Sequence, residues 1–257
     1  AKKKNDANPK FINALLRNII KNKNKINIQS NFQDLPKWFI KKNKNWNKKQ
    51  KIDFVKTIKE KPSLHLVFKF SNDIKKLKLN GIKTSENSIA MEYTGAIENI
   101  SGYQEGLWWI QDFSVMLPLY LSKNMKNKLA VDMCAAPGGK TFQALNYGAL
   151  LQAFEINNDR ANLMKKNLQR LNFRENILIK NILKIKDKNK YDIVLLDAPC
   201  TSVGTIRRNP EIFFRKAIPD FKKIISIQNN LLEKAKLIVK KNGAIIYMVC
   251  SFLKEEG

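Results

Sequence analysis

Five short apolar runs between residues 129 and 250 constrain the fold more than any other feature of the sequence. Helical patterns separate several of them, notably at 158–171 and 219–240. Continuous apolar strands that alternate with helices are typical of a parallel sheet buried on both faces. We therefore predict an α/β domain with a mostly parallel, doubly wound sheet over 107–257. The runs are LAVDM (129–133), LLQAFEI (150–156), NILI (176–179), DIVLLDA (192–198) and AIIYMVC (244–250).

The first 106 residues show a more mixed pattern. Apolar residues at helical spacing, such as Phe11, Leu15 and Ile19, predict a short amphipathic helix followed by a polar linker within 1–30. Over 31–106 we predict a small α+β domain that resembles a βαβ block. Its expected elements are a helical stretch at 35–60, a strand at HLVFKF (65–70), a second helix, and a strand at SIAMEY (88–93).

Composition indicates the kind of partner. The chain of 257 residues has 48 Lys or Arg and 22 Asp or Glu, a formal net charge of +26. Such a charge attracts polyanions, so we expect a nucleic acid partner. A membrane surface fits less well because the basic residues are spread along the chain. Compositional drift towards Lys, Asn and Ile remains an alternative explanation of the charge.

The cysteines and the hydropathy pattern indicate the compartment. Cys134, Cys200 and Cys250 lie far apart and form no CxxC pair, which argues against a disulfide framework and structural zinc. No apolar run approaches the roughly 20 residues that cross a bilayer. The first ten residues lack the apolar stretch of a signal peptide. We expect a reduced, cytoplasmic protein without a metal.

Polar side chains fall where the predicted strands end. Ligands of open parallel sheets bind beyond the carboxyl ends of the strands. A single polar residue at a strand end could be a helix cap or a buried hydrogen-bond partner. Because such a residue lies at or just past the end of each of the five predicted strands, a binding site is the better interpretation. These residues are Asp132, Cys134, Glu155, Asn181, Asp197 and Cys250.

The first strand runs into CAAPGGKT (134–141), whose small residues let the backbone approach a ligand closely. A phosphate-binding P-loop requires glycine where Cys134 stands, and the dinucleotide motif GxGxxG is absent. A loop that binds S-adenosylmethionine is the third interpretation. It is supported by Glu155, about 20 residues further on, where a carboxylate can accept ribose hydroxyl protons. A purely structural turn is a fourth.

Two further motifs carry cysteines. In LDAPCTSVGTIRRNPE (196–211), a proline fixes the turn that follows the strand, so Asp197 and Cys200 are expected to face a cleft. Arg207 and Arg208 suit RNA phosphates, or form a solvated basic pair. Cys250 is the last residue of the fifth apolar run. A lone free cysteine is often a plain core residue, but two on adjacent strands beside an acid favour a site.

Four segments resemble the Sun/RsmB and Nop2/NSUN family of RNA 5-methylcytosine methyltransferases. They are EGLWWIQDFS (105–114), DMCAAPGGKT (132–141), DAPCTSVGTIRRNP (197–210) and VCS (249–251). In addition, LPKWFIKKNKNWNKKQ (35–50) is similar to the bacterial RsmB-type linker, and FINALLRNI (11–19) to the last helix of its NusB-like RNA-binding domain. The resemblance favours the bacterial branch.

The resemblance implies a Rossmann-like class I methyltransferase domain at 107–257, an RNA-binding domain at 31–106, and a helical remnant at 1–30. It also implies that the chain is truncated at both ends. It implies S-adenosylmethionine as cofactor. The residues expected to hold the cofactor are Cys134, Ala135, Ala136, Pro137, Gly138, Gly139, Lys140, Glu155, Arg160, Asn181 and Asp197.

The implied reaction is methylation of carbon 5 of a cytosine in small-subunit (16S) ribosomal RNA by a monomeric enzyme. By resemblance, Cys250 is the nucleophile, Cys200 takes part in its release, and Asp197 and Lys140 assist. Arg207 and Arg208 are expected to contact RNA. The sequence departs from the family at Asn181, where Asp is usual, and at Val249, where Thr is usual.

Two alternatives stay open at this point. The chain could be an inert protein that binds ribosomal RNA during ribosome assembly. Such a protein would have the same basic charge as the enzyme but would not need Cys200 and Cys250. It could also be a P-loop nucleotidase, with Asp197 as the acid that holds magnesium.

Overall fold

The computed structural model describes residues 8–22, 31–122, 124–174, 176–215 and 217–257. The chain divides into two compact units, residues 1–57 and 58–257. Among the described residues, no helix is long and apolar enough to span a membrane.

The first unit is helical. Its amphipathic helix lies within the predicted segment 1–30, with Asn8 as the N-cap and Pro9 in the first turn, where a missing N–H costs nothing. An aromatic cluster joins the remaining segments, with the rings of Phe39 and Phe54 stacked at 5.2 Å and Trp46 5.2 Å from Phe54. The helices are α1 (Pro9–Lys21), η2 (Phe32–Asp34), α2 (Lys37–Lys42) and α3 (Lys48–Lys59).

The large sheet of the second unit has five strands, and all of their pairings are parallel, in the order β7-β6-β5-β8-β9. This confirms the predicted parallel sheet. One boundary differs: the fifth strand ends at Met248, so Cys250 lies two residues beyond it and not within it. The strands are β5 (Leu129–Asp132), β6 (Leu150–Glu155), β7 (Ile177–Ile179), β8 (Tyr191–Asp197) and β9 (Val239–Met248).

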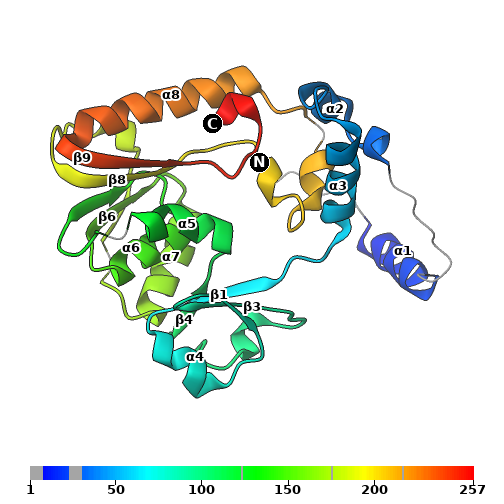
Figure 1. Ribbon diagram of the computed structural model, residues 1–257, viewed down its shortest axis with the longest axis horizontal. Helices are drawn as coiled ribbons and strands as arrows, with labels where there is room; N and C mark the ends of the chain where they lie inside the picture. The colour runs from blue at the N-terminus through cyan, green and yellow to red at the C-terminus, as the bar shows by residue number, and fades with distance from the viewer. Residues whose placement is uncertain (1–7, 23–30, 123, 175, 216) are drawn as a thin grey trace. The chain divides into compact units, whose positions relative to one another are not determined.

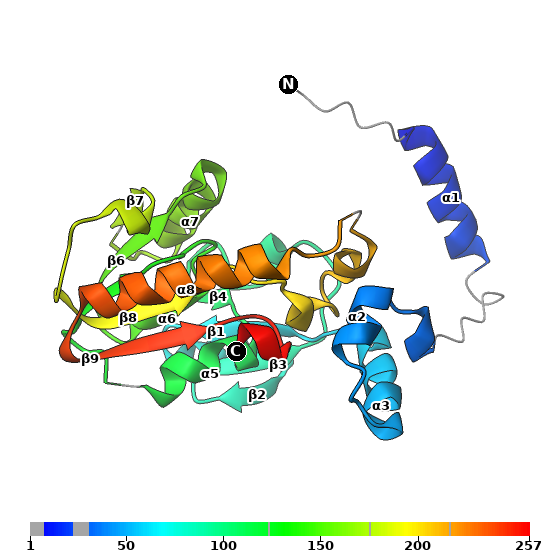
Figure 2. The same cartoon turned by 90° about the horizontal axis from the view of Figure 1, so that it is seen from above.

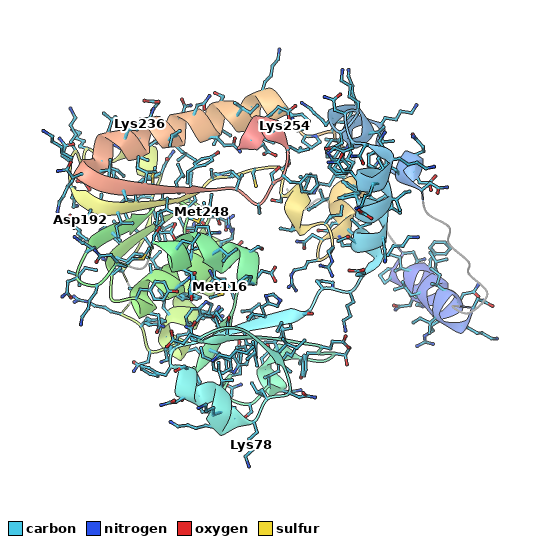
Figure 3. The ribbon with its side chains drawn as sticks, viewed as in Figure 1. Lys78, Met116, Asp192, Lys236, Met248 and Lys254 are labelled. Atoms are coloured by element: carbon cyan, nitrogen blue, oxygen red, sulfur yellow. The ribbon has the colours of Figure 1, made fainter. Side chains whose placement is uncertain are left out.

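Helices cover both faces of this sheet (Figures 1 and 2). Alternate strand residues point to opposite faces, so Ala130 and Leu195 belong to one core cluster and Val131 and Val194 to the other. Helices α5 (Phe113–Leu121), α6 (Gly139–Asn146) and α7 (Asn158–Arg170) pack on the first face, and α8 (Phe221–Ile238) packs on the second. Figure 3 labels Met116 on α5 and Met248 on β9, two members of the first cluster.

The segment before the large sheet forms a second, four-stranded sheet in the order β2-β3-β1-β4. Every pairing in it is antiparallel, so the βαβ-like block expected from the sequence is wrong. Alternation of apolar residues identifies strands but not their direction. The elements are β1 (Leu64–Phe68), α4 (Ser71–Leu77), β2 (Ile82–Ser85), β3 (Ser88–Met91), η3 (Ile97–Asn99) and β4 (Trp108–Ile110).

The small sheet shares its core with the large one. Val67 and Trp109 point away from the cluster under α4 and join the first core cluster of the large sheet. Trp109 Nε1 donates to Gln111 Oε1 at 2.8 Å, and Gln111 Nε2 donates to Gln143 Oε1 on α6 at 2.7 Å. Apolar packing and this series of side-chain hydrogen bonds therefore hold the two sheets in one unit.

We expect Trp109→Ala to lower the free energy of unfolding by about 3–5 kcal/mol, because it empties a site where only 2% of the side chain is exposed. Urea denaturation followed by far-ultraviolet circular dichroism measures this change. Ile110→Ala is the control in the same strand: Ile110 is 39% exposed, so its loss should cost about 1 kcal/mol or less. Equal effects of the two variants would show that the sheets do not share a core.

Candidate active site

The site lies at the switch point of the large sheet. The strands that follow β5 are added first on one side of it, as β6 and β7, and then on the other side, as β8 and β9. β5 is paired with β6 on one side and with β8 on the other, so the loops after β5 and β8 leave the sheet next to each other. Such a switch point forms a crevice at the carboxyl edge of the sheet. The segment 133–138 follows β5 and leads into α6, and the segment 198–202 follows β8.

The loop after β5 is fixed by its glycine and by a buried acid. Gly138 has φ of 113°, and a Cβ there would lie 2.3 Å from the Phe142 ring, so a larger residue does not fit. Asp132 is 1% exposed and accepts hydrogen bonds from Thr141 Oγ1 at 2.7 Å and from the backbone N–H of Cys134 at 3.3 Å. Burial raises the pKa of Asp132 to about 6.

Glu155 ends β6 and reaches back to the same loop. Its carboxylate is buried and accepts from the backbone N–H groups of Ile156 and Asn157, both at 2.9 Å, and of Ala136 at 3.3 Å. Arg160 lies 3.6 Å from Glu155 Oε2 and also donates to the Ala136 carbonyl. The predicted residues Ala136, Glu155 and Arg160 are thus brought together around one loop.

Negative charge gathers at this loop. Burial raises the pKa of the Cys134 thiol to about 12, and three nearby carboxylates act in the same direction: Asp132, Glu155 and Asp197. Cys134 is therefore an unreactive thiol.

The predicted cofactor residue Asn181 is the N-cap of η4 (Ile182–Lys184), and its side chain accepts from the Leu183 N–H at 3.0 Å.

An ion pair connects the loops after β5 and β8. Lys140, at the start of α6, places Nζ 2.5 Å from Asp197 Oδ2 at the end of β8. The Lys140 side chain is 12% exposed and that of Asp197 34%, so the carboxylate faces open space while the amine is largely covered. This arrangement leaves Asp197 accessible to a ligand and holds a positive charge directly behind it.

The two cysteines predicted to act together are in contact. Cys200 Sγ and Cys250 Sγ are 3.2 Å apart, and Cys250 Sγ also lies 3.4 Å from Ser202 Oγ. The hydrogen bond from Cys200, supported by Ser202 and by the charge of Lys140, lowers the pKa of Cys250 to about 6. The pKa of Cys200 is raised, because its proton is held between the two sulfur atoms. Cys250 is thus the thiolate of the pair at neutral pH.

A cleft of about 750 Å³ opens beside these groups. Lys140, Asp197 and Cys250 line it, together with His65 from β1 and Asp112, which follows β4. The residues expected to hold a cofactor between Cys134 and Gly139 do not line this cleft, nor does Glu155. The cleft therefore gives Cys250 a space separate from the glycine loop, and Cys200 does not line it.

The predicted RNA-binding arginines also line the cleft, but protein groups already engage them. Arg208 forms an ion pair with Asp112 through two hydrogen bonds and donates to the Ser63 carbonyl at 2.7 Å. Arg207 donates to the backbone carbonyls of Glu60 and Lys61 at 3.2 and 3.3 Å. Both side chains fasten the segment before β1 to the wall of the cleft.

The sequence analysis missed three residues of this site. Ser202 lies within the motif that carries Cys200, and Asp112 lies within another quoted motif, so both could have been selected by their position. His65 has no such signal: its Nδ1 accepts from the Phe113 N–H at 2.8 Å, a contact across 48 residues.

Comparisons with known proteins identify the family. The family described as 16S rRNA methyltransferase RsmB/F matches residues 119–257. The curated "Ribosomal RNA small subunit methyltransferase B" of Photorhabdus laumondii is 31% identical over 163 residues, 62% of this chain and 38% of the relative. The protein of the same name from Vibrio cholerae is 27% identical over 267 residues, 96% of this chain and 62% of the relative. The chain thus spans from well under half to about three fifths of these proteins.

Solved structures show the same fold. A methyltransferase homologue from Pyrococcus horikoshii superposes with a TM-score of 0.72 at 23% sequence identity, over 98% of this chain and 80% of that one. The described part of the large unit accordingly has the mixed α/β fold of class I, Rossmann-like methyltransferases. Because the family match covers more than half of the sequence and contains the glycine loop and both cysteine motifs, this chain belongs to the 16S rRNA methyltransferase RsmB/F family.

Proposed function

We propose that the chain methylates carbon 5 of a cytosine in small-subunit ribosomal RNA, with S-adenosylmethionine as the methyl donor. The observation that carries this proposal is the contact of Cys200 and Cys250, 3.2 Å apart, beside the Lys140–Asp197 ion pair. The family and its bacterial relatives support ribosomal RNA as the substrate. The paired cysteines support cytosine carbon 5 as the methylated atom.

The residues of the glycine loop fit the methyl donor. Carboxylates surround the loop, which suits a ligand with ribose hydroxyl donors and a positively charged sulfur. Glu155 would accept the ribose hydroxyls, Asn181 would face the adenine edge, and Gly139, where a Cβ would meet nothing closer than 3.7 Å, leaves room for close approach. When bound, S-adenosylmethionine supplies an electrophilic methyl group.

The low pKa of Cys250 provides the nucleophile. Carbon 5 of cytosine is a poor nucleophile by itself. Addition of the Cys250 thiolate to carbon 6 breaks the 5,6 double bond and moves its electron pair to carbon 5, which can then take the methyl group. The hydrogen bond from Cys200 keeps Cys250 ionised at neutral pH before the substrate binds.

Asp197 and Lys140 would hold the pyrimidine. The accessible Asp197 carboxylate lines the cleft and can accept a hydrogen bond from the exocyclic amino group of the cytosine. Lys140, which contacts Asp197 at 2.5 Å, orients that carboxylate and stabilises the Cys250 thiolate by its charge. The pair therefore acts on both the base and the nucleophile.

Cys200 would complete the cycle. After methylation, the proton on carbon 5 must be removed and the bond between Cys250 and carbon 6 must break, which restores the 5,6 double bond and the thiolate. Cys200 is the titratable group that touches Cys250 Sγ. We assign it a part in this release, together with its role in activating Cys250.

RNA would reach the site along a strongly basic surface. The formal net charge of +26 favours a polyanion. Arg207 and Arg208 line the cleft beside Cys250, where the parts of their guanidinium groups left free can contact phosphates. We propose that residues 31–106 contribute to RNA binding and that residues 107–257 carry out methyl transfer.

The cofactor assignment is tested by calorimetry. We expect S-adenosylmethionine to bind and ATP not to bind. Glu155→Gln should weaken binding by roughly 10- to 100-fold, because a buried charged acceptor is replaced by a neutral one. Glu98→Gln, an exposed acid distant in sequence from the loop, is the control. Binding of ATP alone would favour the nucleotidase interpretation.

Replacing each of the two cysteines by alanine should block the reaction at a different step. With a transcript of small-subunit ribosomal RNA and labelled S-adenosylmethionine, Cys250→Ala should transfer no methyl group. Cys200→Ala should accumulate a covalent protein–RNA adduct, visible as a shifted band on a denaturing gel, because release is blocked. The double variant should give no adduct. Methyl transfer by Cys250→Ala would remove Cys250 from the role of nucleophile.

The ionisation of Cys250 can be followed without RNA. Alkylation of Cys250 by iodoacetamide, located by mass spectrometry, should be half-maximal near pH 6 and decline below it, since only the thiolate reacts. In Cys200→Ala the midpoint should rise towards the ordinary thiol value of 9.0, because the stabilising donor is lost. Cys200→Ser keeps a donor and should rise less. A wild-type midpoint near 9 would contradict this activation.

A further inference from the structure

A buried glutamate beyond the second cysteine motif is used by no step of the proposed mechanism. Glu256 lies in η7 (Lys254–Glu256), which packs against α8 and whose first residue is labelled in Figure 3. Only 2% of Glu256 is exposed. A buried carboxylate is costly unless hydrogen-bond donors satisfy its oxygens, so its partners indicate why it is there.

The partners of Glu256 are the residues that directly follow the two cysteines. Thr201, next to Cys200, donates its backbone N–H to Oε1 at 2.8 Å and its hydroxyl to Oε2 at 2.5 Å. Ser251, next to Cys250, donates its hydroxyl to Oε2 at 2.5 Å. One carboxylate therefore holds both cysteine loops, which are 50 residues apart in the sequence.

A helix anchors this arrangement. Gln228 on α8 is 4% exposed, and its Nε2 lies 3.4 Å from Glu256 Oε1 and donates to the Pro199 carbonyl at 3.0 Å. The backbone of the two loops is also joined where Gly204 N–H donates to the Cys250 carbonyl at 3.0 Å. The loops are thus fixed to each other and to one rigid element.

We propose that Glu256 is a positioning residue, which sets the distance between Cys200 and Cys250 by binding Thr201 and Ser251. The proposal rests on the proposed function in that Cys250 is the nucleophile. The two sulfur atoms are 3.2 Å apart, and a shift of either loop by a fraction of this distance weakens the hydrogen bond between them. Glu256 touches neither sulfur and acts only through the neighbouring residues.

The test measures the reactivity of Cys250 in the full chain, with iodoacetamide as the probe across a range of pH. In Glu256→Ala the alkylation midpoint should rise by about one pH unit or more, and the rate at pH 6 should fall about fivefold, because fewer molecules carry the thiolate. In Glu256→Gln the rise should be smaller, because the amide oxygen still accepts the Thr201 N–H but the amide nitrogen cannot accept a hydroxyl proton.

Two further sets of variants distinguish positioning from general instability. Ser251→Ala and Thr201→Val each remove one hydroxyl donor, and each should raise the midpoint less than Glu256→Ala. Glu255→Gln, the exposed neighbour in η7, should leave the midpoint unchanged. Circular dichroism identifies variants that have unfolded; should Glu256→Ala do so, Glu256→Gln and Ser251→Ala decide the outcome.

The outcomes separate this proposal from the proposed function. A wild-type midpoint near pH 6 that stays the same in folded Glu256→Gln and Ser251→Ala would overturn the positioning role of Glu256 and leave the nucleophile assignment intact. A wild-type midpoint near 9 would contradict the activation of Cys250 and the proposal that rests on it. A midpoint that rises in the variants and not in Glu255→Gln supports the positioning role.

Discussion

The parallel pairing of β5 with β8 at the centre of the large sheet is the constraint on which the site depends. Asp132 and Asp197 end these neighbouring strands, so the loop that precedes α6 and the loop that carries Cys200 leave the sheet side by side. β9 lies next to β8 and delivers Cys250 to the same edge. Backbone hydrogen bonds fix these strands in register, so the loops that carry the acid and both cysteines emerge at one edge of the sheet.

The polar groups in this region differ in their hydrogen-bond partners and in their exposure to solvent. These differences give the groups different chemistry. Glu155 and Glu256 accept several hydrogen bonds and are fixed in place. Asp197 has a single strong partner and remains one-third exposed, so it can still bind a ligand. The pKa of Cys134, among carboxylates, is raised, whereas the pKa of Cys250, beside Cys200, is lowered. Three cysteines near one edge therefore differ in reactivity through their surroundings alone.

The large sheet could be predicted from the sequence because its apolar runs are continuous and its motifs lie at strand ends. The small sheet could not, because the alternation in 65–70 and 88–93 fits parallel and antiparallel pairing equally well. The cysteine pair was suggested by its place at the ends of adjacent strands, and the roles of Lys140 and Asp197 by the resemblance. The contacts of Glu256 with Thr201 and of Arg208 with Asp112 span 55 and 96 residues, and no local pattern encodes contacts at such separations.

The way in which Arg207 and Arg208 hold the wall of the cleft has a consequence for substitutions in the segment before β1. Three of their contacts are to the main-chain carbonyls of Glu60, Lys61 and Ser63, and every amino acid presents a main-chain carbonyl. Substitutions in this short segment can therefore leave these three hydrogen bonds intact, whereas replacement of the arginines removes them. The wall of the cleft beside Cys250 is thus held largely through the backbone of this segment and not through the identity of its side chains.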